Sequence, residues 1–313
     1  MMPRVMMPRV KVPRVTIERA HCSRQWGEGK SKVPIGSQPI PNYNSAVSAR
    51  LHAEAVLHAL TGLRFGHPVY LYGQVGSTNA VAKQLAEAGA PEGLLVLAET
   101  QTAGRGRAGR AWITPAGTAL ALSLLLRPKL PLAQVTRLMM LAGVSVCEAI
   151  EQETGLRPAL KWPNDVLIAS KKAGGILIES GLAGDHLDYA VVGIGLNVSE
   201  APVLGALDFP AAALQSVAGR AVDRLRLLRA LLQQLADSYA DLAAPESGQL
   251  YAAWSARLAW LGERVVAYES EGEIQGTLDG ADADGALRVR LDSGEIRRVL
   301  AGDVSLRKEV AHV

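Results

Sequence analysis

Two nearly continuous runs of Ile, Leu and Val constrain the fold of this chain most strongly. They cover residues 175–180 and 188–197 and follow each other closely. A strand with one face in water alternates apolar and polar residues, whereas a strand covered on both faces reads as an unbroken apolar run. The two runs therefore predict a sheet whose inner strands lie between layers of helices.

Further helices and strands are predicted around this pair. Apolar residues at helical spacing, with suitable end residues, indicate helices at 53–60, 77–89, 131–154, 223–244 and 246–258. Short apolar runs indicate strands at 68–72, 94–99, 118–126, 159–162 and 166–169. Ser77 is a typical helix N-cap residue, and Gly155 a typical stop. The pattern as a whole predicts an α+β domain.

The two ends of the chain differ from this middle part. After Gly262, short β-rich pieces alternate with closely spaced turn signals, which predicts a small antiparallel barrel. Residues 1–43 repeat the pentapeptide MMPRV and contain six prolines, which rule out a helix or a central strand. We therefore expect a disordered basic tail at 1–43, a main domain at 44–260 and a small β domain at 261–313.

Composition excludes several classes of protein. The net charge of +3 comes from the tail, because residues 1–43 hold eight basic and two acidic side chains. The remainder is slightly acidic, which disfavours a general nucleic-acid binder. No apolar run approaches the roughly 20 residues of a membrane span, and no secretory signal is evident. Cys22 and Cys147 are too few for a disulfide framework or a metal cage. A cytoplasmic protein is expected.

The segment GRGRAGR at 104–110 is the strongest functional signal. We call it the Gly/Arg loop. Glycine allows a backbone to approach a ligand closely, and arginine offers a planar set of donors for carboxylates and phosphates. The pattern favours a mobile loop that closes over an anionic small molecule. A solvated basic turn and an RG-type nucleic-acid contact are the alternatives.

Four other clusters are candidate sites. Hydroxyl and amide groups stand at a helix start at 77–79, and Lys, Asn and Asp flank Trp162-Pro163 at 161–165. Lysines precede paired glycines at 171–175, and glycines interrupt an apolar strand at 192–197, where they indicate a bulge or a ligand that passes close by. Taken singly, an N-cap and an Asn-Asp turn explain the first two clusters better than a binding site does, and a lysine-rich hairpin tip explains the third equally well.

In this order and spacing the clusters resemble the biotin protein ligases. The resemblance extends over roughly residues 46–308, and its most specific parts are the Gly/Arg loop and the Lys-Trp-Pro-Asn-Asp run at 161–165. It implies a mixed sheet with flanking helices, related to class II synthetases, and a C-terminal SH3-like barrel. It also implies that MgATP activates biotin to biotinyl-5′-AMP, which then acylates a lysine of a biotin carboxyl carrier protein, such as the acceptor domain of acetyl-CoA carboxylase.

The resemblance also implies roles for single residues. The catalytic residues would be Lys172 and Arg107. Biotin would be held by these two and by Ser77, Thr78, Asn79, Gln101, Arg105 and Gly106. ATP and the adenylate would be held by Arg107, Arg110, Trp112, Asn164, Asp165, Asn197 and Arg307, with Asp165 on the Mg²⁺ side. Ala108 departs from the family pattern, in which this position is often basic.

Some family members carry an N-terminal DNA-binding winged helix. Residues 1–43 lack the helical periodicity for one, so we expect a monofunctional ligase without specific DNA binding or a membrane partner. Exposed strand edges allow a homodimer, which occurs in the family together with monomers, and the sequence leaves both open. A lipoate or octanoyl ligase of the same superfamily, a biotin-sensing regulator and an RG-rich RNA binder remain the alternatives.

Overall fold

The computed structural model describes residues 50–113, 115–202, 210–243, 248–269, 272–300 and 305–308. The expectations for the tail at 1–43 lie outside these residues. Seven strands form a mixed sheet in the order β1-β2-β3-β7-β6-β5-β4. The first pair is parallel and the others are antiparallel. The strands are β1 (Val69–Tyr72), β2 (Leu95–Ala98), β3 (Ala119–Leu126), β4 (Ala159–Lys161), β5 (Asp165–Ile168), β6 (Lys171–Ala183) and β7 (His186–Asn197).

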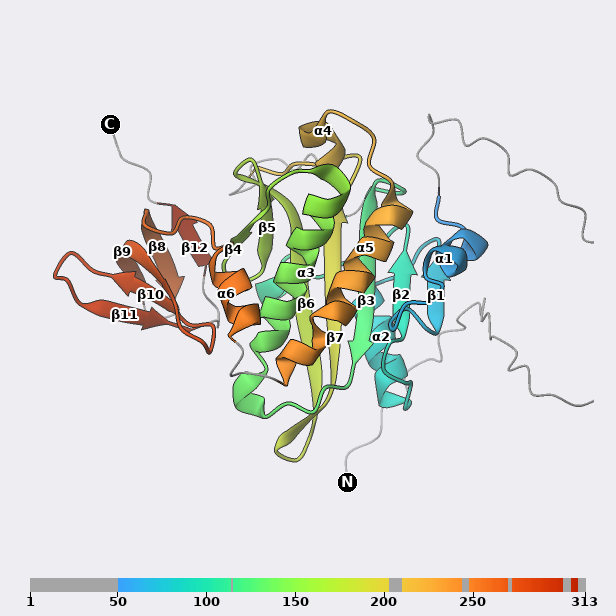
Figure 1. The fold of residues 1–313 in the computed structure, drawn as a ribbon, viewed down its shortest axis with the longest axis horizontal. Helices are drawn as coiled ribbons and strands as arrows, with labels where there is room; N and C mark the ends of the chain where they lie inside the picture. Colours follow the sequence, from blue (N-terminus) through green and yellow to red (C-terminus); the bar gives the residue numbers. More distant parts are fainter. Residues whose placement is uncertain are drawn as a thin grey trace, which may run out of the picture.

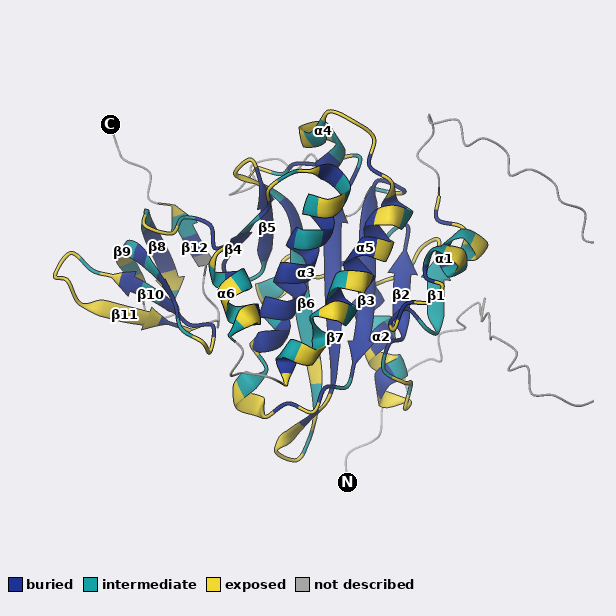
Figure 2. Ribbon diagram, in the orientation of Figure 1, coloured by how far each residue is buried: buried dark blue, intermediate teal, exposed yellow. Residues whose placement is uncertain are grey.

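Helices cover both faces of this sheet, as the unbroken apolar runs predict. Figure 1 shows α3 (Arg137–Thr154) and α5 (Arg224–Asp237) side by side on one face, and α2 (Thr78–Glu87) behind the sheet. The remaining helices are α1 (Ala53–Ala59), α4 (Leu214–Ala218) and α6 (Gln249–Ser255). In Figure 2 the strands β2, β3 and β7 are dark blue along most of their length, α3 is mostly buried, and α5 has exposed residues on its outer side.

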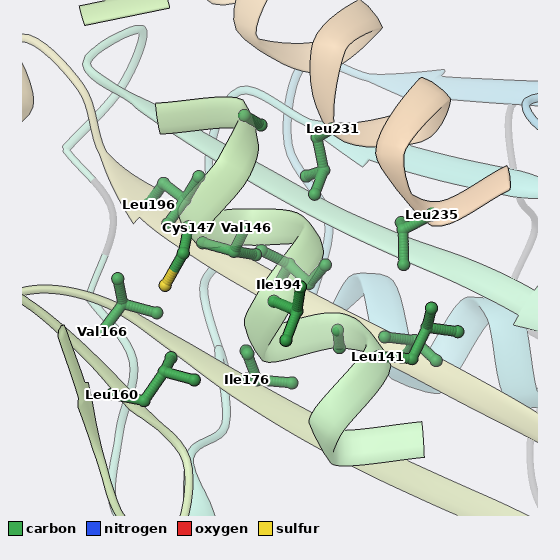
Figure 3. Close-up of a cluster of buried hydrophobic side chains, with 14 of the residues drawn as sticks. Leu141, Val146, Cys147, Leu160, Val166, Ile176, Ile194, Leu196, Leu231 and Leu235 are labelled. Carbon is green, nitrogen blue, oxygen red and sulfur yellow. The ribbon is translucent and has the colours of Figure 1, made fainter. Parts of the chain in front are cut away.

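The main core lies between the sheet and the helices α3 and α5. Figure 3 shows Val146 and Cys147 of α3 close to Ile194 and Leu196 of β7, with Leu231 of α5 nearby. A smaller cluster joins α2 to the opposite face through Ala82, Ala86, Leu94, Val96, Leu125, Tyr189 and Val191. Alternate residues of β2, β3 and β7 thus belong to different cores, which explains their continuous apolar sequence.

Helix α3 and the turn before it are long and apolar enough to resemble a membrane span. Within the stretch Leu132–Thr154, an 18-residue window has a mean hydropathy of 1.3, and 67% of that window is buried inside the fold. Because α3 packs against α5 and the sheet, this stretch is accounted for as a core helix.

Several predicted boundaries differ from the structure. The helix predicted from Pro131 begins as a 3₁₀ turn, Leu132–Gln134, before α3 starts at Arg137. Helix α5 stops at Asp237, and a 3₁₀ turn at Tyr239–Leu242 follows, where the Tyr239 hydroxyl donates to Glu92. Strand β6 is longer than the predicted 175–180, because it pairs with β7 along almost its whole length. The short helix α4 was not predicted.

The C-terminal part forms a second sheet of five antiparallel strands in the order β11-β10-β9-β8-β12. Its strands are β8 (Arg264–Glu269), β9 (Gly272–Ala281), β10 (Leu287–Arg290), β11 (Ile296–Val299) and β12 (Ser305–Lys308). The predicted barrel is not closed. Within the described residues β11 pairs with β10 and β12 with β8, and no ladder joins the two edge strands. This small sheet lies beside β4 and α6 (Figure 1).

Candidate active site

One cavity brings the predicted site residues together. It has a volume of about 550 Å³ and lies against the sheet at the start of α2, below the Gly/Arg loop. Each residue singled out from the sequence lines it: Ser77, Thr78, Asn79, Gln101, Arg105, Gly106, Arg107, Arg110, Trp112, Asn164, Asp165, Lys172, Asn197 and Arg307. Segments that are up to 230 residues apart along the chain therefore converge on one site.

The floor of the cavity includes two glycines of β7. On the face of β7 that α2 covers, Tyr189 and Val191 belong to the small core, and the next residues on that face are Gly193 and Gly195. A Cβ atom at Gly193 would collide with the Asn79 amide, and one at Gly195 with the Trp112 ring. The glycines predicted to mark a close approach thus accommodate two side chains of the site itself.

The register of the sheet aligns the floor with two charged residues. Lys161 of β4 pairs with Asp165 of β5, Asp165 pairs with Gly175 of β6, and Gly175 pairs with Gly195 of β7. This row crosses four neighbouring strands at one level. It places an ammonium and a carboxylate group at one end of a row whose other two positions, Gly175 and Gly195, carry no side chain.

A buried polar network lies at the α2 end of the cavity. The Ser123 hydroxyl is 2.6 Å from Asn79 Oδ1 and 2.8 Å from Thr78 Oγ1, so its single proton is shared between two acceptors. The backbone N–H of Thr78 donates to Gln101 Oε1 over 2.8 Å. Gln101 therefore satisfies an amide at the start of α2. Ser77 occupies the N-cap position, but its hydroxyl forms no capping hydrogen bond and lines the cavity instead.

The network continues to the Gly/Arg loop through Glu179 of β6. Glu179 Oε2 accepts hydrogen bonds from Asn79 Nδ2 over 2.9 Å and from Arg105 Nη2 over 3.0 Å. One carboxylate thus ties the start of α2 to an arginine of the loop. Glu179 was not singled out from the sequence, because a glutamate within an apolar strand has no local signal for this role.

The Gly/Arg loop forms a small hairpin over the cavity. Arg105 bridges to Ala111, and the Gly106 N–H donates to the Arg110 carbonyl over 2.7 Å. The tip is a 3₁₀ turn at Arg107–Gly109, in which Ala108 has φ 51° and ψ 40°. A non-glycine residue in this left-handed region is strained by roughly 1 kcal/mol or more.

Asp165 is the centre of a compact charge cluster. Its carboxylate lies 2.5 Å from Lys172 Nζ and 3.7 Å from Lys161 Nζ. Burial lowers the pKa of the Lys161 ammonium group below 10.5, Asp165 opposes this shift, and Lys172, Arg307 and Arg110 add to it. The cluster therefore holds an excess of positive charge in a partly desolvated place, which is suited to a polyanion.

Two buried polar atoms in the cavity have no hydrogen-bond partner among the described residues. They are Asn197 Oδ1, in a side chain that is 2% exposed, and Trp112 Nε1. The Asn197 amide is oriented by its nitrogen, which donates to the Ala212 carbonyl over 3.2 Å. A buried unpaired acceptor and donor are unfavourable until a ligand supplies the missing partners.

The side chains of the cavity fit Mg²⁺ that arrives with phosphates. Within the described residues no three His, Cys, Asp or Glu side chains group into a metal cage. Mg²⁺ keeps several waters and often binds through one or two protein oxygens together with substrate phosphates. The Asp165 carboxylate and the unpaired Asn197 Oδ1 are oxygen ligands of this kind.

Sequence reasoning gave no individual role to three residues of the site: Ser123, Lys161 and Glu179. Lys161 stood within a recognised run, and its signal was its place next to Trp162. A hydroxyl in the apolar strand at 119–126 was the available signal for Ser123.

Comparisons with known proteins agree with this geometry. Residues 71–197 match the biotin/lipoate A/B protein ligase family, and residues 261–307 match the biotin protein ligase C-terminal domain. A biotin–[acetyl-CoA-carboxylase] ligase of Paracoccus denitrificans is 39% identical over 223 residues, which cover 70% of this chain and 92% of that protein. A bifunctional ligase/repressor of Bacillus subtilis is 34% identical over 257 residues, or 78% of each chain.

A solved structure extends the similarity to three dimensions. The biotin protein ligase of Aquifex aeolicus in complex with biotin and ATP is 30% identical, with a TM-score of 0.66, over 78% of this chain and all of that chain. Both parts of the fold, the residues that line the cavity and these relatives lead to one conclusion. This chain belongs to the biotin protein ligase family.

Proposed function

We propose that this protein activates biotin with MgATP to give biotinyl-5′-AMP and pyrophosphate, and transfers the biotinyl group to a lysine of a biotin carboxyl carrier protein. The observation that carries the proposal is that the Gly/Arg loop and Lys172 line one cavity with Asn197 and Trp112. The biotin carboxylate attacks the α-phosphorus of ATP, and pyrophosphate leaves. The lysine amine of the carrier then attacks the acyl carbon, and AMP leaves.

Biotin occupies the α2 end of the cavity in this proposal. Its ring system lies beside Asn79, which packs on Gly193, and its polar atoms meet the network of Ser77, Thr78, Asn79 and Gln101. Arg105 and Gly106 close the loop over it. The network is internally hydrogen-bonded, so its groups are oriented before the ligand arrives, which lowers the entropy lost on binding.

The reaction centre requires alignment and positive charge rather than a protein nucleophile. Two anionic groups must meet, and cationic donors lower the barrier by neutralising the charge that develops. Lys172 and Arg107 serve this purpose in our proposal. Lys172 Nζ lies 2.5 Å from Asp165 and 6.0 Å from the centre of the Trp112 ring, so its position is defined from two sides.

The nucleotide occupies the other end of the cavity. Trp112 supplies a flat ring for the adenine, and Asn197 Oδ1 supplies a buried acceptor. Arg110, Arg307 and Lys161 surround the phosphates, and Asn164 and Asp165 lie on their metal side. Mg²⁺, when bound with ATP, neutralises phosphate charge. Closure of the Gly/Arg loop excludes water and protects the adenylate from hydrolysis.

The biotin reading is preferred over a lipoate or octanoyl ligase. The match of residues 261–307 to the biotin protein ligase C-terminal domain supports it, as do the names of the relatives. We further propose that the protein acts in the cytoplasm. We also propose that it does not bind specific DNA, because residues 1–43 lack the helical periodicity of a winged helix. Among the described residues β1 is an edge strand of the sheet, and this edge supports a homodimer. Salt-dependent binding to a palindromic site would contradict the DNA part of this proposal.

The test is acceptor labelling by the purified chain with Mg²⁺, ATP, a carrier domain, and either labelled biotin or labelled lipoate. Labelling by biotin and not by lipoate is expected. Lys172→Ala should lower biotin-dependent pyrophosphate exchange by roughly a hundredfold or more, the size of a removed charge-stabilising group. Lys171→Ala, at an exposed neighbour, is the matched control and should leave the exchange rate unchanged.

Arg107→Ala separates formation of the adenylate from its retention. The variant should fold and should release adenylate faster than the wild type, as measured by filter binding. Lipoate labelling, or normal exchange by Lys172→Ala, would contradict the assignment of substrate or of catalytic residue, respectively.

A further inference from the structure

Trp162 links the active-site run at 161–165 to the C-terminal sheet. Its neighbour Lys161 and the nearby Asp165 carry charges of the cavity, and Trp162 itself borders the cavity while its ring, 3% exposed, packs into the core. The indole Nε1 donates to the carbonyl of Gly285, 123 residues further along, over 3.0 Å. Trp162, which bonds the main domain to the C-terminal sheet, thus lies directly next to the reaction centre.

The acceptor of this hydrogen bond, Gly285, lies in a turn that packs closely against the start of α3. Gly285 has φ +87°, and a Cβ there would lie 3.4 Å from Met140 Cε and 3.5 Å from Thr136 Cβ, at the start of α3. Arg298 of β11 binds Asp282 and Asp284 of the turn, each over 2.6 Å. The turn is therefore rigid within its own sheet and fits closely against α3.

A second hydrogen bond fixes the same segment from α6. The Tyr251 hydroxyl donates to the carbonyl of Ala281 over 2.7 Å. Ala281 is the last residue of β9 and directly precedes the turn. Two side chains of the larger part, one beside the cavity and one away from it, thus hold a stretch of five residues, 281–285.

The edge strand β12 of the small sheet borders the active site. Strand β12 pairs with β8, and its residues Leu306 and Arg307 line the cavity. Because β8, β9 and β12 belong to one hydrogen-bonded sheet, a shift of the docked turn moves Arg307 as well. The position of Arg307 therefore depends on how the 281–285 segment is held.

We propose that Trp162 and Tyr251 are positioning residues that, by docking the 281–285 segment, place Arg307 at the nucleotide end of the cavity. The proposal rests on the proposed function, in which that end binds ATP. It predicts that these two side chains act on ATP through Arg307 and leave biotin binding unaffected. Tyr251 does not line the cavity, so an effect of its hydroxyl on ATP must be transmitted through the small sheet.

The experiment measures KM for ATP and for biotin by pyrophosphate exchange, together with Tm. Trp162→Phe and Tyr251→Phe should each raise KM for ATP by roughly three- to tenfold, the size of one lost hydrogen bond, with KM for biotin changed less than about twofold. Tyr239→Phe removes a comparable hydroxyl bond, to Glu92, away from the small sheet. It should lower Tm without changing either KM.

A double-mutant cycle with Arg307→Ala decides the mechanism. In that background, Tyr251→Phe and Trp162→Phe should change KM for ATP less than about twofold, since the residue they position is gone. Additive effects, or equal rises of both KM values, would overturn the proposal. If Trp162→Phe fails to fold, Tyr251→Phe carries the test. Failure of the proposed function would appear instead as absence of biotin-dependent exchange in the wild type.

Discussion

Ser123 puts a hydroxyl into a strand whose other seven residues are Ala or Leu. The side chain is fully buried and contacts Thr78 and Asn79, which line the cavity, while Ser123 does not line it. A buried hydroxyl that serves two acceptors fixes the rotamers of both partners. Ser123 is therefore a residue that orients the biotin end of the site without touching the ligand.

Ser123→Ala tests this role. The variant leaves Asn79 Oδ1 without its donor, so KM for biotin should rise by roughly tenfold while KM for ATP stays within about twofold. Steady-state kinetics of pyrophosphate exchange measure both values. Equal KM values for variant and wild type would show that Asn79 and Thr78 keep their orientation unaided.

The candidate site was predictable where its residues are consecutive in the sequence. Lys172 and Arg107 stand in dense runs whose order and spacing resemble a known family, so their roles could be predicted without a fold. Ser123 and Glu179 stand alone in apolar strands, and their partners lie 44 and 100 residues away at Asn79. Such long-range hydrogen bonds follow from strand register, which a single sequence does not specify.

At the scale of elements, the base of the Gly/Arg loop is held by helix α5. The segment that carries the Gly/Arg loop connects β2 to β3. Glu99 lies at its start, directly after β2, and Ala119 lies at its end, as the first residue of β3. Arg224 of α5 donates to Glu99 Oε2 and to the Ala119 carbonyl, each over 3.1 Å. The Leu51 N–H donates to the same carboxylate over 2.7 Å. A buried ion pair thus joins both ends of this segment to one helix.

Arg224→Met should lower the free energy of unfolding by about 3–5 kcal/mol, because it leaves the Glu99 carboxylate buried without its cation. Arg226→Met is a matched control on the same helix. Arg226 is 73% exposed and pairs with Glu153, so its loss should change stability by less than about 1 kcal/mol. Urea unfolding compares the two variants. Similar values for both would refute a special contribution of the buried pair.

Helix and strand positions were predictable to different degrees. Helix α3 ends at Thr154 with Gly155 at φ 75°, as the glycine stop predicted. Helix α5 ends earlier than its apolar periodicity predicted. Tyr239, just after its end, packs edge-to-face against Phe65, with ring centres 5.2 Å apart. Local periodicity identifies a helix, but tertiary contacts decide its last turn.

For the whole molecule, the strand order was the part that sequence reasoning could not supply. Strand β3 pairs with β7 rather than with β4, because α3 intervenes and the chain returns to the sheet at its far edge. That order brings Asp165 and Gly195 into one row. The α+β class and the small β domain could be predicted from the spacing of apolar residues and turn signals, whereas barrel closure, inferred from the same turn signals and from the family resemblance, was wrong.

Acid should weaken the docking turn of the small sheet. The Ala286 N–H and, after it, Arg298 hold the pKa of Asp284 below 3.8, its ordinary value. The stabilisation by this carboxylate is therefore complete above pH 3.8 and is lost as the pH falls through the lowered pKa of the folded state. Because the side chain is 49% exposed, its contribution is about 1 kcal/mol or less.

Asp284→Asn should accordingly lower Tm slightly at neutral pH, and the difference from wild type should shrink as the pH falls below 3.8. Calorimetry at several pH values measures this. A difference that grows in acid would mean that the carboxylate destabilises the folded state, contrary to its contacts with Ala286 and Arg298.

The floor at Gly193 and Gly195 has a thermodynamic consequence. Main chain fixed in a central strand has no rotamers to lose, and the Asn79 amide packed on Gly193 is already held by Ser123 and Glu179, so binding of the vitamin orders little there. The conformational entropy that is lost on binding then comes mainly from the Gly/Arg loop. Calorimetric binding entropy should accordingly respond to changes in that loop and remain insensitive to the strand beneath.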